Sequence, residues 1–286
     1  MKPFRTLIVV LLCLSAALAR AEEKPVPVSA ADALKVLVTR QKDLLAKAGE
    51  KTERTEIEDM RSEFQDLVFS YEDYLNKYPD VAAGYVSYAM LLNQPILEQR
   101  KQAAALLLKA NQLDANLPLV KNQLGNYLAE EGRPLDALNY YLAAVKLAPD
   151  EPLYHYQIGT LLNDAREDFL KSDAWTRATL DQSMQDAFEH ASALAPGNIG
   201  YAYRYGESFY DLERPEWSAA LVFWRALEEK VNTVLAKETI RLHQANVLIH
   251  QEKFAEANAV LATVKEPALQ GQKQKLVAQL PAQSAR

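Results

Sequence analysis

One stretch of the chain, residues 118–151, constrains the fold more than any other. It reads PLVKNQLGNYLAEEGRPLDALNYYLAAVKLAPDE, and both of its halves carry apolar and small residues at helical spacing. The members of the two stripes are Leu124, Gly125 and Leu128 in the first half, and Ala137, Tyr141, Ala144 and Leu147 in the second. Gly132-Arg133-Pro134 interrupts the helical pattern, and Pro149 ends it. The stretch therefore predicts two short amphipathic helices with a tight turn between them.

The pattern recurs along the chain. Gly159 lies about 34 residues after Gly125, the length of one such helical pair, and Gly206 opens a third pair. Weaker pairs are indicated at residues 85–113 and 245–264. Small residues at these places have a physical reason, because two helix backbones can cross closely only where side chains are small.

The order of these residues resembles the tetratricopeptide repeat, a helix-turn-helix unit of about 34 residues. The resemblance covers most of residues 82–265, strongly in the middle and loosely at the ends. It implies an all-α fold, a right-handed α-solenoid of stacked helical pairs. A generic helical bundle with an accidental echo of the motif is the alternative, although a bundle does not require this period or order.

Residues 1–21 are typical of an export signal peptide. A basic start precedes an apolar run at residues 7–14 that is too short to span a bilayer, and Ala19-Arg20-Ala21 provides a small-x-small cleavage site. Cleavage after Ala21 would leave Glu22 as the first residue, so we expect a periplasmic or secreted protein. A lipoprotein signal ending at Cys13 is the competing interpretation, and we expect contact with a membrane only if Cys13 is lipidated.

The flanks of the repeats are less regular. Residues 22–80 are predicted to hold an extended leader and an N-terminal helical pair, either a cap or a degenerate repeat. Ser29 and Asp32 resemble a helix-opening pattern, and Leu67 and Tyr74 stand where small residues would be expected. Residues 81–266 form the predicted solenoid. Residues 267–286 are predicted to be a capping helix and a frayed tail, with the helix facing inward through Leu269, Leu276, Val277 and Leu280.

An insertion around residues 163–179 adds about 13 residues to the motif length of about 34. One interpretation is that both helices of this pair are longer, with a turn near residues 171–173. The other is a projecting hairpin that offers Phe169 and Trp175 to a partner as a secondary contact.

Composition and motifs argue against several classes of function. Signal cleavage would remove the only cysteine and leave 29 basic against 38 acidic residues, a net charge of −9, and no basic stripe suggests nucleic acid. No nucleophile elbow or phosphate-binding glycine loop is present. The four histidines form no metal-ligand pattern, although His243 and His250 share a helix face. We therefore expect no catalytic residue, no metal and no cofactor.

The class of function that remains is binding of a partner on the protein surface. The resemblance implies that the first helix of each pair lines a concave groove, where a peptide would lie. The residues expected to form this peptide-binding groove are Asn122, Asn126, Tyr156, Thr160, Asn163, Tyr203, Glu207 and Tyr210. Tyrosines provide rigid contact area and asparagines can pair with a peptide backbone. Packing between adjacent first helices is an equally good explanation of the tyrosines. The lysines of the family's carboxylate-clamp members are absent from these positions.

We therefore expect a non-catalytic protein-protein interaction scaffold that binds an extended peptide or a helix in the concave groove, within a bacterial envelope assembly. Its partner is another protein or peptide, and a homo-oligomer is possible. Two alternatives stay open. One is a helical-toroid enzyme acting on cell-wall or polysaccharide substrates, which would need carboxylates and aromatics on inner loops. The other is a self-assembling solenoid whose end repeats stack between molecules.

Overall fold

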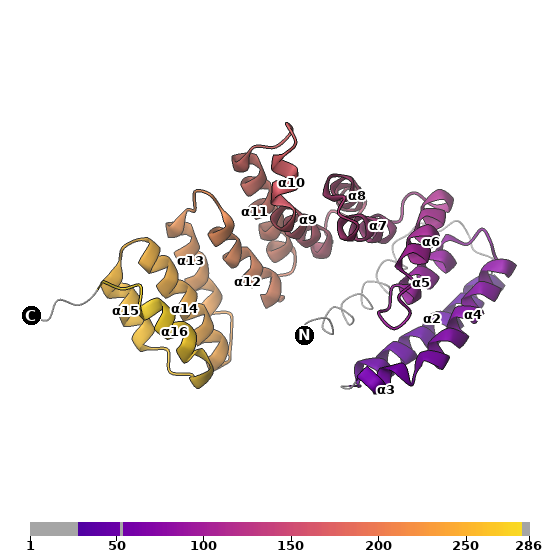
Figure 1. Cartoon of the computed structure of the whole chain (residues 1–286), viewed down its shortest axis with the longest axis horizontal. Helices are drawn as coiled ribbons and strands as arrows, with labels where there is room; N and C mark the ends of the chain where they lie inside the picture. Colours follow the sequence, from indigo (N-terminus) through magenta and orange to yellow (C-terminus); the bar gives the residue numbers. More distant parts are fainter. Residues whose placement is uncertain (1–27, 52–53, 282–286) are drawn as a thin grey trace, which may run out of the picture. The chain divides into compact units, whose positions relative to one another are not determined.

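The computed structural model describes residues 28–51 and 54–281, and this part of the chain contains helices and no strand (Figure 1). The all-α class predicted from the repeats is therefore confirmed. The predicted signal peptide, Cys13, the leader before residue 28 and the tail after residue 281 lie outside the described residues. The chain divides after Pro149 into two compact units. Unit 1 precedes this point and unit 2 begins at Asp150.

Unit 1 consists of an N-terminal helical pair and two repeat pairs. Its helices are α2 (Val28–Gly49), α3 (Arg54–Glu58), α4 (Arg61–Lys77), α5 (Ala82–Leu92), α6 (Arg100–Leu113), α7 (Pro118–Glu130) and α8 (Pro134–Leu147). Helices α5 and α6 form one pair, and α7 and α8 form the next. Because α2 already begins at Val28, Ser29 and Asp32 lie inside the helix and do not open it, contrary to the prediction.

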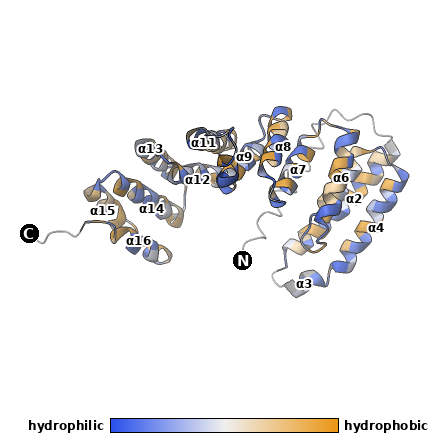
Figure 2. Ribbon diagram, turned by 45° about the horizontal axis from the view of Figure 1, so that its top comes forward, coloured by the Kyte–Doolittle hydropathy of each residue, from blue (hydrophilic) through white to orange (hydrophobic). Residues whose placement is uncertain are grey.

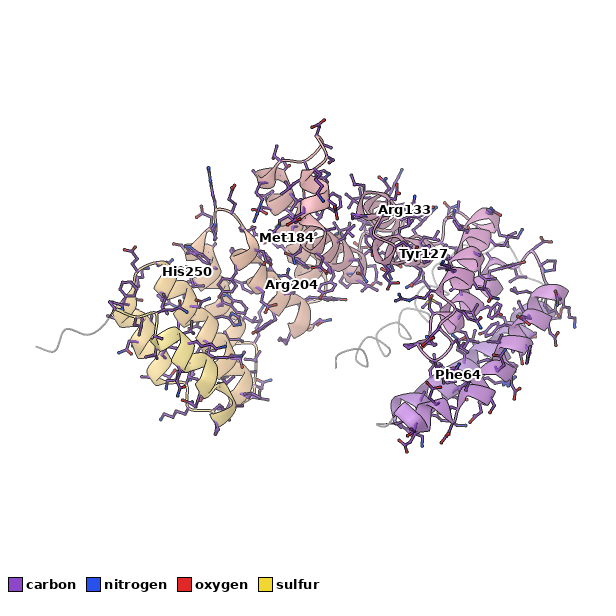
Figure 3. All side chains as sticks on the ribbon, in the orientation of Figure 1. Phe64, Tyr127, Arg133, Met184, Arg204 and His250 are labelled. Atoms are coloured by element: carbon purple, nitrogen blue, oxygen red, sulfur yellow. The ribbon has the colours of Figure 1, made fainter. Side chains whose placement is uncertain are left out.

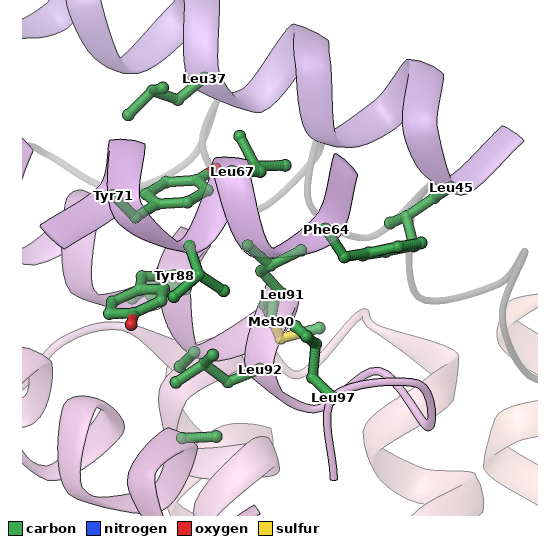
Figure 4. Packing of buried hydrophobic residues seen from close by; sticks show 14 of the residues in the cluster. Leu37, Leu45, Phe64, Leu67, Tyr71, Tyr88, Met90, Leu91, Leu92 and Leu97 are labelled. Carbon is green, nitrogen blue, oxygen red and sulfur yellow. The ribbon is translucent and has the colours of Figure 1, made fainter. Parts of the chain in front are cut away.

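The N-terminal pair is joined to the repeats by a buried aromatic core. The ring of Tyr71 on α4 stacks on that of Tyr88 on α5, with centroids 5.5 Å apart. The Tyr71 hydroxyl donates a hydrogen bond to the Gln41 side chain on α2 at 2.6 Å, so one side chain links three helices. Figure 4 shows both rings surrounded by the leucines of the same cluster, among them Leu37 and Leu67. The two tyrosines thus hold the N-terminal pair against the first repeat pair.

Unit 2 contains three helical pairs, the insertion and a C-terminal helix. Its elements are α9 (Pro152–Asp164), α10 (Arg166–Leu170), α11 (Arg177–Leu194), α12 (Ile199–Ser208), η1 (Phe209–Asp211), α13 (Trp217–Glu228), α14 (Val234–His250), α15 (Phe254–Ala262), η2 (Pro267–Leu269) and α16 (Gln270–Val277). The pairs are α9 with α11, α12 with α13, and α14 with α15. Most helices of both units carry hydrophobic and hydrophilic residues on one ribbon, as amphipathic helices do (Figure 2).

The recurring glycines lie where an aromatic ring of the second helix crosses the first. A Cβ atom placed on Gly125, Gly159 or Gly206 would come within 2.6, 2.8 and 2.5 Å of the rings of Tyr141, Phe188 and Trp224, respectively. Real Cβ atoms essentially never approach other heavy atoms so closely. The sequence period of the glycines therefore reflects one packing contact, repeated three times in two units.

The turn between α7 and α8 follows the predicted chemistry. Gly132 has a φ angle of 72°, a left-handed conformation that glycine adopts without a steric penalty. Pro134 then occupies the first turn of α8, where its fixed φ suits the helix and its missing N–H is not needed.

The C-terminal segment packs as a short helix preceded by a turn. Leu269 is buried, and Leu276 and Leu280 are half-buried against α14 and α15. Val277, which was predicted to face inward, is 43% exposed. The prediction was wrong for this residue because α16 ends at Val277 and turns its other side to the unit.

Candidate functional site

The predicted groove residues fall in both units, so each unit is considered by itself. In unit 1, Asn122 is 0% exposed, and neither atom of its side-chain amide has a hydrogen-bond partner among the described residues. Asn126 is half-buried and accepts a hydrogen bond from the Tyr141 hydroxyl at 2.8 Å. Asn122 therefore cannot contact a peptide, contrary to the prediction, because it points into the helical core. Asn126 serves the contact between α7 and α8.

In unit 2, α9 contributes three half-buried residues, spaced so that they share one helix face. Tyr156 packs against the rings of Phe188 and Tyr201, with centroids 5.7 and 5.1 Å away. The hydroxyl oxygen of Thr160 is buried and has no hydrogen-bond partner in the described part of the chain. Asn163 donates to Asp164 at 3.0 Å. Tyr156 thus connects α9 to α11 and α12, which agrees with packing between adjacent helices.

The most elaborate cluster joins α12 and η1 to α14. Its centre is His243, whose ring stacks on Trp224 with centroids 4.2 Å apart and planes 12° apart. The Tyr203 hydroxyl hydrogen-bonds to His243 Nε2, and the Tyr210 hydroxyl lies 3.2 Å from Nδ1 and 3.3 Å from the His243 carbonyl oxygen. Two predicted groove tyrosines are therefore held by one histidine that lies on the first helix of the next pair.

Burial decides the protonation of this cluster. The interior environment lowers the pKa of His243 to about 4, so the ring is neutral near pH 7 and carries one N–H. One arrangement satisfies all three groups: Tyr203 donates to Nε2, Nδ1–H donates to Tyr210, and Tyr210 donates to the His243 carbonyl. Burial also raises the pKa of Tyr203 to about 12, with the nearby Glu207 carboxylate adding to the effect. Both phenols therefore keep their protons and use them inside the cluster.

The aromatic contacts continue toward the end of α14. Tyr210 lies against Trp217, with centroids 5.7 Å apart, and Trp217 stacks on His250 at 4.3 Å with nearly parallel planes. Figure 3 labels His250 on α14 and Arg204 on α12, and the aromatic side chains themselves come from α12, η1, α13 and α14. His243 and His250 do share a face, as the sequence predicted, but both use that face for aromatic packing.

Charged groups border the cluster on α12 and η1. Arg204 pairs with Asp211 at 3.0 Å, and its guanidinium lies 4.2 Å above the Phe188 ring centre. Glu207 is half-buried, and no hydrogen bond or ion pair to it is found among the described residues. Burial raises the pKa of the Glu207 carboxyl, an effect that Arg204 opposes and Asp211 reinforces. The Glu207 carboxylate is thus a hydrogen-bond acceptor beside the cluster that no described residue uses.

The aromatic side chains of the insertion pack against each other. Phe169 on α10 is 0% exposed and meets the ring of Trp175 edge to face, with centroids 5.4 Å apart. Asp181 on α11 accepts hydrogen bonds from Arg177 and from the backbone N–H of Glu213, both at 2.7 Å, and so links the start of α11 to the segment after η1. The proposed secondary contact through Phe169 is therefore wrong, because that ring fills the interior of the hairpin. Trp175 is half-buried beside it.

Elsewhere in the described residues we find weaker candidates for a functional site. A hollow of about 250 Å³ lies between α2 and α4, but its walls carry charges of both signs, and the Lys47–Glu63 pair at 3.7 Å is exposed on both sides. No group of three or more potential metal ligands occurs in residues 28–51 and 54–281. Within the same residues, no helix is long and apolar enough to cross a membrane.

Sequence reasoning missed the residues that organise the cluster. The only property predicted for His243 was a helix face shared with His250, and no role was predicted for Arg204, Asp211 or Trp224. His243 lies 40 residues from Tyr203 and 33 from Tyr210. The second separation is close to one repeat length, so corresponding positions in consecutive first helices are the signal that would have found the contact.

No protein-family model matches the sequence, and no curated protein matches it. Solved structures do match in fold. The crystal structure of YrrB, described as a TPR protein with an unusual peptide-binding site, is 15% identical, and the match covers 68% of this chain and 90% of YrrB with a TM-score of 0.53. PilF of Pseudomonas aeruginosa is 16% identical, and the match covers 86% of this chain and 99% of PilF with a TM-score of 0.55.

Proposed function

We propose that this chain, which has the fold of tetratricopeptide repeat proteins, is a non-catalytic scaffold that binds a partner protein through an extended peptide or a helix. The binding surface is the face that α9, α12 and α14 form in unit 2. The observation that carries the proposal is the cluster of Tyr203, His243 and Tyr210. Its hydrogen bonds hold two half-buried tyrosines in place before any ligand arrives.

Such a preorganised aromatic surface favours binding for a physical reason. Ordering a free side chain at an interface costs about 0.5–1.5 kcal/mol, and a tyrosine already fixed by His243 avoids most of that cost. Tyrosine also supplies much contact area with few rotatable bonds. YrrB, whose fold this chain shares, is itself described as having a peptide-binding site, which supports the same class of function here.

Site-directed photocrosslinking in native cells tests the proposal. A photoreactive residue at Asn163, half-buried on α9, should capture one discrete partner, and the same residue at the exposed Gln182 on α11 should not. Equal capture at the two sites, or none at Asn163, would contradict binding on this face. Mass spectrometry of the captured band identifies both the partner and the crosslinked segment.

The cellular location is proposed from the N-terminal sequence. Cleavage after Ala21 would release a chain that begins at Glu22 into the periplasm or the medium, where it would act within an envelope assembly. The mass of the protein isolated from cells checks this directly. A chain whose N-terminus is a lipidated Cys13 would instead establish the lipoprotein alternative.

A further inference from the structure

The starting point is the position of Glu207. It lies four residues after Tyr203 and three before Tyr210, so the three residues follow one stripe along α12 and η1. The two tyrosines are anchored to His243, whereas the Glu207 side chain is half-buried and has no hydrogen bond or ion pair among the described residues. A partly buried carboxylate without a partner loses hydration and gains nothing in return.

The neighbouring donors are already in use. Arg204, the nearest cation, forms an ion pair with Asp211 at 3.0 Å and covers the ring of Phe188. The two tyrosine protons are directed at His243, which is itself neutral near pH 7 because burial lowers its pKa to about 4. Among the described residues Glu207 therefore has no ion pair, because Arg204 influences its carboxyl only at longer range and is itself paired with Asp211, whose carboxylate also acts on Glu207.

We propose that Glu207 binds an arginine or lysine side chain of the partner peptide, with Tyr203 and Tyr210 on either side of it along α12 and η1. This inference rests on the proposed function and specifies the chemistry of the ligand. A guanidinium suits the position best, because it can donate two parallel hydrogen bonds to one carboxylate. Its flat face can also lie against a tyrosine ring, an attraction that grows when the pair is shielded from water.

The reduced exposure of Glu207 explains why this contact would select a ligand. Ion pairs between fully exposed side chains contribute little, because water and salt screen them. At a half-buried position the screening is weaker, and a ligand without a positive charge would leave the carboxylate unpaired in the complex. The site would therefore discriminate against neutral peptides as well as attract basic ones.

Peptide selection followed by a double-mutant cycle tests the proposal. Random dodecapeptides displayed on phage are selected on the purified protein, and the bound region is mapped by hydrogen exchange. The best peptide is then synthesised with its arginine and with citrulline, which has nearly the same shape but no charge. We expect arginine or lysine at one fixed peptide position, and at least a tenfold weaker Kd for the citrulline peptide.

Two variants test whether the Glu207 carboxylate is responsible for the preference for arginine. Glu207→Gln removes the charge and should bind the two peptides equally well, while Glu216→Gln, in an exposed loop of the same unit, should keep the tenfold difference. Circular dichroism and urea unfolding show that each variant is folded. Tenfold discrimination that persists in Glu207→Gln, or equal binding of both peptides by the unmodified protein, would overturn the role of Glu207 while leaving peptide binding intact. Selection of no peptide, or protection outside α9, α12 and α14, would overturn the proposed function and this inference together.

Discussion

Lowering the pH from 7 to 5 should destabilise unit 2 through a single side chain, His243. Its imidazole is half-buried among Trp224 and two tyrosines, and this environment lowers its pKa to about 4 in the folded protein from an ordinary value of about 6.5. A pKa that is lower in the folded state means that the unfolded chain binds the proton more readily. The stabilisation by neutral His243 is therefore complete above pH 6.5 and is lost as the pH falls toward 4.

The size of the effect follows from the two pKa values. One pKa unit corresponds to about 1.4 kcal/mol, so complete protonation would lower the free energy of unfolding by about 3 kcal/mol. At pH 5 the unfolded chain is already almost fully protonated at this site and the folded one is not, which gives a loss of about 2 kcal/mol between pH 7 and pH 5. Most carboxylates titrate below this range and contribute little to it.

Urea unfolding followed by tryptophan fluorescence measures this loss. The three tryptophans of the chain, Trp175, Trp217 and Trp224, all lie in unit 2, so the signal reports that unit alone. The variant His243→Phe keeps a flat ring against Trp224 but cannot be protonated. It should be less stable at both pH values, because Tyr203 and Tyr210 lose their partner, yet lose about 2 kcal/mol less than the natural protein on acidification.

The comparison includes a matched control. His190→Gln changes an exposed histidine of the same unit and measures the effect of removing an imidazole that lies outside the cluster. If the natural protein and His243→Phe lost the same free energy between pH 7 and pH 5, the assignment of a buried neutral imidazole would be refuted.

Three further predictions concern packing and capping. Gly206→Ala should lower the stability of unit 2 by about 2 kcal/mol in urea unfolding, because the added Cβ would lie 2.5 Å from Trp224. The control Gly271→Ala has open space around it and should raise stability by about 0.5 kcal/mol. Equal effects of the two substitutions would contradict the packing contact at Gly206. Asn122→Leu should stabilise unit 1 by about 1 kcal/mol in thermal unfolding, because the buried Asn122 amide has no hydrogen-bond partner among the described residues. A lower stability of the variant would instead indicate that an internal water is bound to the amide. The backbone N–H of Glu266 donates to the Glu238 carboxylate and holds the pKa of that carboxyl low. The stabilisation of the folded protein by Glu238 is therefore present above about pH 4.3 and lost at lower pH. Glu238→Gln should make unit 2 less stable at pH 6 and should reduce the further loss of stability of unit 2 between pH 6 and pH 3.5.

The helices and their pairing were predictable because the information is local. A stripe such as Leu124, Gly125 and Leu128 indicates a helix and its inner face within two turns, and Gly132 with Pro134 marks the turn. The recurrence of one glycine at a fixed period indicates that the same crossing is repeated. These signals depend on backbone geometry and on helical spacing, which are properties of a short segment.

The candidate site was only partly predictable, because helical spacing shows which residues share a face and not what covers that face. Asn122 and Phe169 were expected at the surface, yet neighbouring helices bury both completely. Tyr203 and Tyr210 were identified as groove residues, but their anchoring depends on His243, which comes from another helix 40 and 33 residues away, respectively.

The sequence by itself determined the helical repeats of this protein, since periodic apolar and small residues leave few other ways to bury an apolar face. Tertiary structure alone decided which polar groups find partners. Glu207 is one of many acidic residues in the chain, and its half-buried side chain has no partner among the described residues because Arg204 pairs with Asp211 while the tyrosine hydroxyls bond to His243. An unpaired charge is a property of the whole neighbourhood, and that neighbourhood exists only after the helices have packed.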